Sequence, residues 1–193
     1  MRSKTYYFTS ERLGFRNWTD DDTEPFAALN ADPRVMEFFP NVRTKIETEE
    51  FLMRVTQQFH EYGYGWFAVD ELACGNFIGF IGISHPKFET FFTPCLEIGW
   101  RLAKEYWNKG YATEGAQACL DYAFTILKVN EVYSFTAVQN IRSENVMKKI
   151  GMLKIGEFDH PMLPGSWLER HVLYKISNPR LGAINDQKNP YGS

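Results

Sequence analysis

The chain has 193 residues and a formal net charge of −3, with 44% hydrophobic and 16% aromatic residues. These values fit one globular domain with a sizeable core, and they disfavour nucleic acid as the partner. Three scattered cysteines and four histidines without ligand spacing predict neither a disulfide framework nor a metal site. No signal-peptide pattern and no apolar run of ~18 residues occur, so we expect a cytoplasmic protein that does not bind membranes.

The apolar periods predict alternating strands and helices. In chain order we expect a strand, two helices, three strands, a helix, a strand, a helix and two paired strands, at residues 12–17, 19–29, 44–62, 65–71, 76–84, 93–102, 111–127, 131–138, 141–150, 152–160 and 169–176. The second helix has the clearest start, because Thr44 and Glu47 form a capping box. We therefore predict a single α/β (α+β) domain over residues 1–177 with a mixed sheet, followed by a flexible tail at 178–193.

The segment from strand to helix at residues 97–115 has unusual local chemistry. Gly99 lies inside the predicted strand, which indicates a bulge or a close backbone approach. Residues 108–113, Asn-Lys-Gly-Tyr-Ala-Thr, begin the next helix with no carboxylate before Glu114. The free N–H groups and the positive helix end, with Lys109 beside them, favour a phosphate at this position. An ordinary junction whose N–H groups bind water is an equal alternative.

Four segments together resemble a known family: the strand "LEIGWRL", the turn "YWNKGYATEG", the strand "YSFTAVQN" and the helix "IRSENVMKKIGM". They are similar to the GNAT acetyltransferase superfamily, and most of all to its ribosomal-protein N-terminal acetyltransferases. The resemblance covers residues 11–176. It implies a mostly antiparallel sheet, flanked by helices, in which two central parallel strands at 98–102 and 132–138 splay apart. Acetyl-CoA is the implied co-substrate, with its pantetheine arm in the gap and no metal.

The resemblance also implies which residues bind the cofactor. Backbone groups of Trp100 and Leu102 would pair with pantetheine like an added strand, and residues 107–112 would hold the pyrophosphate. Asn140 would bind a pantetheine amide, against the alternative of turn chemistry at the strand end. The full set is Ile98, Gly99, Trp100, Arg101, Leu102, Trp107, Asn108, Lys109, Gly110, Tyr111, Ala112, Thr113, Asn140, Asn145 and Lys149. For the last two residues, a solvated helix face is an equal alternative.

Two residues are candidate catalytic groups by the same resemblance. Glu97 would deprotonate the amine through a water, and a solvated edge glutamate is its alternative. A backbone N–H near Gly99 would bind the oxyanion. Many members carry a tyrosine as the acid for the leaving thiolate, but the matching residue is Met147, which cannot donate a proton. Ser143 is therefore the candidate acid, with plain helix capping as the alternative.

The implied acceptor is an amine at a protein N-terminus or on a small molecule. Residues 38–40 and 159–167 would line its site, although core packing is the favoured alternative for the aromatic side chains. A non-catalytic acyl-CoA sensor is a second functional hypothesis, since Met147 replaces the tyrosine. Dimers are frequent in this branch, so a homodimer is an open expectation.

Overall fold

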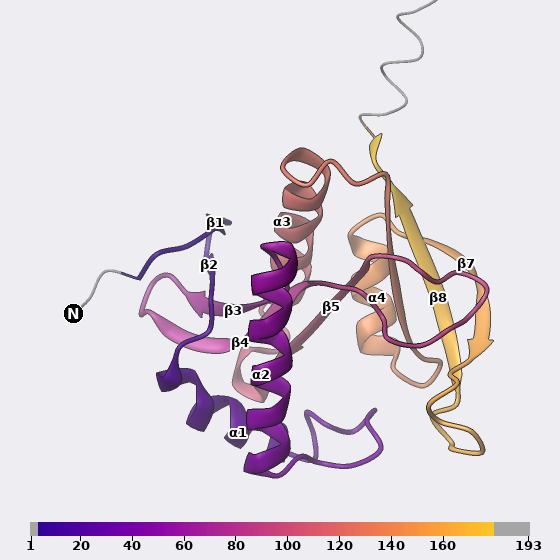
Figure 1. Ribbon diagram of the computed structural model, residues 1–193, viewed down its shortest axis with the longest axis horizontal. Coiled ribbons are helices and arrows are strands. Elements are labelled where there is room, and N and C mark those ends of the chain that lie inside the picture. Colours follow the sequence, from indigo (N-terminus) through magenta and orange to yellow (C-terminus); the bar gives the residue numbers. More distant parts are fainter. Residues whose placement is uncertain (1–3, 180–193) are drawn as a thin grey trace, which may run out of the picture.

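The computed structural model describes residues 4–179. Its elements follow the predicted order closely, with one extra short strand at the start and two 3-10 turns (Figure 1). They are β1 (Phe8–Thr9), β2 (Leu13–Arg16), η1 (Asp20–Asp22), α1 (Thr23–Ala31), α2 (Lys45–Tyr62), β3 (Trp66–Glu71), β4 (Asn76–Ser84), β5 (Glu97–Leu102), η2 (Lys104–Tyr106), α3 (Tyr111–Thr125), β6 (Glu131–Ala137), α4 (Ile141–Lys149), β7 (Leu153–Asp159) and β8 (Arg170–Ser177). Most of the predicted tail, from residue 180 on, lies outside the described residues.

The strands form one sheet in the order β1-β2-β3-β4-β5-β6-β8-β7. Every neighbouring pair is antiparallel except β5 and β6, which run parallel. Helices α3 and α4 pack on the face that carries Ile98 and Leu102, whereas α1 and α2 pack on the opposite face, which carries Phe80. The predicted fold class, a mixed and mostly antiparallel sheet flanked by helices, is confirmed.

Local sequence signals explain where the helices lie. At the start of α2 the Thr44 N–H donates to the Glu47 carboxylate at 2.7 Å, and the Glu47 N–H donates to the Thr44 hydroxyl at 3.2 Å, which is the predicted capping box. Helix α3 lies close to the sheet because Gly115 has no side chain. A Cβ at that position would collide with Ile81 of β4. The contact sets the distance between the start of α3 and the central strands.

The predicted bulge at Gly99 is wrong. Strand β5 pairs with β4 in an unbroken register from Leu102 opposite Gly79 to Glu97 opposite Ser84. The physical reason for the glycine is space, because a Cβ there would lie 3.1 Å from the indole ring of Trp66 on β3. The close neighbour of this glycine is thus a side chain and not the backbone approach that was the other expectation. The register shifts that the sheet does contain lie between β3 and β4 and between β7 and β8.

A buried ion network joins the first strands. The Arg16 guanidinium binds the carboxylate of Asp22 at 2.6 Å and that of Asp70 at 2.7 Å, and all three side chains are at most 4% exposed. The network fastens η1 to β2 and β3. Each buried charge thus has an opposite charge in direct contact, which is the usual condition for burying ions.

Candidate active site

Strands β5 and β6 separate almost as soon as they meet. Their one paired position is Glu97 opposite Tyr133, where the Tyr133 N–H donates to the Leu96 carbonyl at 2.8 Å. Beyond it the Ser134 hydroxyl donates to the Ile98 carbonyl at 2.9 Å, in place of a backbone ladder. The predicted splayed parallel pair is therefore present. It leaves one side of β5 open to a ligand that can act as a strand.

The backbone polarity of β5 determines which groups face this gap. The Ala103 N–H donates to the Ile78 carbonyl on β4 at 2.9 Å, so by alternation the backbone of Trp100 and Leu102 points toward β6. The Leu102 carbonyl already accepts a 2.8 Å hydrogen bond from the Trp107 indole. Trp100 therefore presents the freer backbone amide in the gap. The Trp107 contact, which the sequence did not predict, ties the following turn to the strand.

The start of α3 is uncapped, as predicted. Gly110 is the N-cap residue in the left-handed region, at φ 83°, and Asn108 has a φ of 60°. Among the described residues no side chain caps the helix, and the first intrahelical bond runs from the Glu114 N–H to the Gly110 carbonyl. The Glu114 carboxylate is occupied by the Ser10 hydroxyl and by Arg12. The exposed N–H groups and the positive helix end are thus available to an anion.

One cavity of about 620 Å³ joins the open side of β5, the start of α3 and the face of α4. It has the size of a typical small-molecule site. Every predicted site residue except Lys109 lines it: Glu97, Ile98, Gly99, Trp100, Arg101, Leu102, Trp107, Asn108, Gly110, Tyr111, Ala112, Thr113, Asn140, Ser143, Asn145 and Lys149. The Lys109 ammonium instead lies 5.2 Å from the centre of the Tyr106 ring. The fold thus brings these residues together, and their individual roles stay predictions.

Glu97 lies in the cavity wall where the strands part. In the described part of the chain its carboxylate has no hydrogen bond and no ion pair, and burial raises its pKa to about 8. The neighbouring Cys95 thiol has its pKa raised to about 12, by burial first and then by the Glu97 charge. A carboxylic acid with a pKa close to neutral can take up and release a proton under working conditions.

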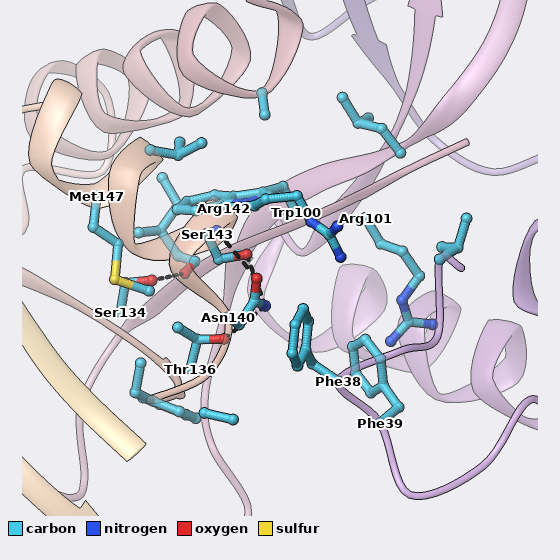
Figure 2. A pocket seen from close by; sticks show the side chains of 18 of the residues that line it. Phe38, Phe39, Trp100, Arg101, Ser134, Thr136, Asn140, Arg142, Ser143 and Met147 are labelled. Atoms are coloured by element: carbon cyan, nitrogen blue, oxygen red, sulfur yellow. Dashed lines mark hydrogen bonds between the residues drawn. The ribbon is translucent and has the colours of Figure 1, made fainter. Parts of the chain in front are cut away.

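Asn140 and Ser143 form a linked pair at the start of α4 (Figure 2). The Asn140 side-chain oxygen accepts from the Ser143 N–H at 3.2 Å, and its amide nitrogen donates to the Ser143 hydroxyl at 3.1 Å and to Thr136 at 2.9 Å. Asn140 is thus the N-cap residue of α4, a role that was not predicted for it, and its binding of pantetheine stays a prediction. Because the Ser143 oxygen accepts from Asn140, its own proton is free to point elsewhere. Met147, one turn on, is 1% exposed and also lines the cavity.

Sequence reasoning missed one cation and misjudged two aromatic residues. Arg142 of α4 pairs with Glu37, and its guanidinium lies 4.7 Å from the Trp107 ring centre and 5.3 Å from that of Phe38. Phe38 and Phe39 are half-buried and line the cavity, so the favoured core-packing alternative is wrong for them. Since these contacts join the α1–α2 loop to α4, no local sequence pattern indicates them.

Residues 4–179 contain neither a membrane-spanning helix nor a metal-binding cluster. No helix in this range is long and apolar enough to cross a bilayer. The same range contains no group of three or more histidine, cysteine, aspartate or glutamate side chains placed to hold a metal ion.

Comparison with known proteins identifies the family. Residues 12–153 match the family model described as an acetyltransferase (GNAT) domain. The uncharacterized protein YkkB of Bacillus subtilis is 35% identical over 156 residues, which are 79% of this chain and 87% of that one. The crystal structure of a GNAT-family acetyltransferase from Bacillus anthracis has a TM-score of 0.73 and 30% identity, covering 88% of this chain and 97% of that chain. The chain therefore belongs to the GNAT acetyltransferase family and is an acetyl-CoA-dependent acetyltransferase.

A more distant structure shares the fold. Spermidine N-acetyltransferase from Vibrio cholerae, in complex with CoA and spermine, has a TM-score of 0.68 and 21% identity, covering 86% of this chain and 96% of that chain. A likeness at this identity is one of fold. It does not carry the acceptor of that enzyme over to this chain.

Proposed function

We propose that this chain transfers an acetyl group from acetyl-CoA to a primary amine by direct attack, with both substrates bound at once. The observation that carries the proposal is that Glu97 and the uncapped start of α3 open onto the same cavity, joined by the unpaired side of β5. A ligand with a pyrophosphate at one end and an amide-rich arm fits these features in that order. Acetyl-CoA supplies the activated acetyl group as a thioester.

Each step of the transfer has a candidate group in this chain. Glu97 accepts the amine proton through a water, and the amine nitrogen forms its bond to the acetyl carbon as the carbon–sulfur bond breaks. The Trp100 N–H, which points into the gap, binds the oxygen on which negative charge develops. The Ser143 hydroxyl gives its proton to the leaving sulfur, and solvent restores it. Asn140 positions Ser143 through the hydrogen bonds described above.

Binding and turnover test different parts of this proposal. Saturation with CoA at 100 times Kd adds about 2.7 kcal/mol to the stability of the folded chain. We therefore expect acetyl-CoA and free CoA to raise the melting temperature by about 5–10 °C, and ATP and NAD to leave it unchanged. An amine panel with a free-thiol readout then tests transfer. If no CoA species stabilises the chain, the cofactor assignment is wrong.

A non-catalytic acyl-CoA sensor is the alternative, and the buried Met147 is the feature that favours it, because methionine cannot protonate a thiolate. The substitution Glu97→Gln separates the two functions. An enzyme loses turnover and keeps its affinity for CoA. A sensor shows no turnover before or after the change, and its response to acyl-CoA persists.

A further inference from the structure

The face of β5 that turns away from α3 carries two ionisable side chains. Because side chains alternate along a strand, Glu97, Gly99 and Arg101 point to the same face, and all three line the cavity. Glu97 and Arg101 are four residues apart, so their Cα atoms are separated by about 13 Å. The Trp66 ring lies over Gly99 between them and makes this part of the wall apolar.

Arg101 is buried without a counter-ion. The residue is 7% exposed. Its guanidinium lies 4.2 Å from the Phe39 ring centre (Figure 2) and 5.3 Å from that of Phe80. One nitrogen, Nη1, donates to the Asn30 side-chain oxygen at 2.7 Å, while the buried Nε has no acceptor in the part of the chain that the structure describes. Across residues 4–179 no carboxylate comes within ion-pair distance of it.

A neighbouring cation makes the missing counter-ion of Arg101 more costly. Burial, together with the nearby cation of Arg43, lowers the pKa of Arg101 to about 9, so it stays protonated at neutral pH. The other deeply buried guanidinium, Arg16, directly contacts two carboxylates. A buried cation with an unmet donor is costly unless an anion completes its environment. Arg101 lines the cavity, so a ligand bound there can supply this anion.

We propose that Arg101 binds a carboxylate of the acceptor, so that the acceptor is an amino-acid-like or short peptide amine rather than a polyamine. The inference rests on the proposed function, since the acceptor amine is taken to lie toward Glu97. A guanidinium donates in a planar fork that matches a carboxylate, and the two flanking aromatic rings exclude water from the pair. A second ammonium at this point would instead meet Arg101 and Arg43, which repel it.

The test compares acceptors that differ only in the distal group. With acetyl-CoA saturating, kcat/KM is measured for glycine, glycylglycine, triglycine and 5-aminopentanoate, for the amide of each, and for pentylamine and 1,5-diaminopentane. A charged hydrogen bond supports a preference of about 10- to 100-fold for the best carboxylate over its amide. Equal rates within every pair, or a preference for the diamine, overturn the inference.

Variants link the preference to Arg101. Arg101→Gln should bring the carboxylate down to the rate of its amide, so that the ratio within each pair falls to about one, and Arg101→Lys should keep part of the preference. A loss that is equal for charged and neutral amines means that Arg101 only supports the fold, which overturns the inference. Arg34→Gln is the matched control, because Arg34 is an exposed guanidinium paired with Asp32 outside the cavity.

Two readouts keep the inference separate from the proposed function. If the enzyme acetylates amines but does not prefer a carboxylate over its amide, the role of Arg101 is overturned and the transferase function stands. Failure of every amine overturns both. If Arg101→Gln does not fold, the pairs measured on the unmodified chain still decide, and so does the melting-temperature shift caused by N-acetylglycylglycine against its amide with CoA present.

Discussion

Replacing Glu97 by glutamine should make the chain more stable and less active at the same time. The pKa of Glu97 is about 8 in the folded chain against an ordinary value of 4.5, because burial penalises the charged carboxylate. A folded-state pKa above the unfolded value means that the folded chain holds this proton more tightly. Stability is therefore lost as pH rises from 4.5 to 8.

The size of the effect follows from linkage. With these two pKa values, the ionisation of Glu97 in the unfolded chain lowers the free energy of unfolding by about 1 kcal/mol at pH 5 and about 3 kcal/mol at pH 7. Glutamine cannot ionise and escapes this loss. For a chain of this size the Glu97→Gln variant should melt about 6–12 °C higher at pH 7. Loss of the base should lower kcat by about 100-fold or more.

Urea unfolding of both proteins from pH 5 to 8.5 is the assay, and the prediction is that the stability difference widens steadily with pH. Glu131→Gln is the matched control on the neighbouring strand, because hydrogen bonds from Tyr133 and Lys175 lower the pKa of Glu131. That variant should show no such gain. A stability difference for Glu97→Gln that is absent, or constant across pH, would refute the reasoning about the buried carboxyl.

Three other changes test separate parts of the structure. Ser143→Ala should lower kcat by about 10- to 100-fold and keep the KM for acetyl-CoA, as free-thiol release will measure; an unchanged kcat would mean that the Ser143 hydroxyl only accepts the hydrogen bond from Asn140. Gly110→Ala forces an L side chain into a φ of 83°, so titration calorimetry should show CoA binding weakened by at least about fivefold, and equal affinity would mean the turn does not hold the cofactor. Arg16→Met leaves the buried carboxylate of Asp22 without a counter-ion and that of Asp70 with Lys4 alone, and it should cost about 3–5 kcal/mol in urea unfolding, whereas a cost under about 1 kcal/mol would contradict the network.

Local chemistry made much of the fold and part of the site predictable. The capping box at Thr44 and the change of apolar period at Gly65 depend on neighbours in the chain, so the sequence alone located α2, β3 and β4. The uncapped start of α3 was predictable for the same reason. Its free N–H groups follow from which residues occupy 108–114, wherever the rest of the chain lies. The two-residue strand β1 was missed because so short an element has no period to detect.

Only the tertiary structure determines the features that join segments distant in the sequence. The reason for Gly99 is a tryptophan ring on another strand, and the raised pKa of Glu97 comes from burial that no local pattern encodes. No local pattern indicates that the Arg101 side chain donates to Asn30, which lies 71 positions away in the chain. Hydrogen bonding within a helix or turn is set by adjacent residues. Desolvation and charge pairing are set by whichever side chains the fold brings into contact, and so they became known only with the folded chain.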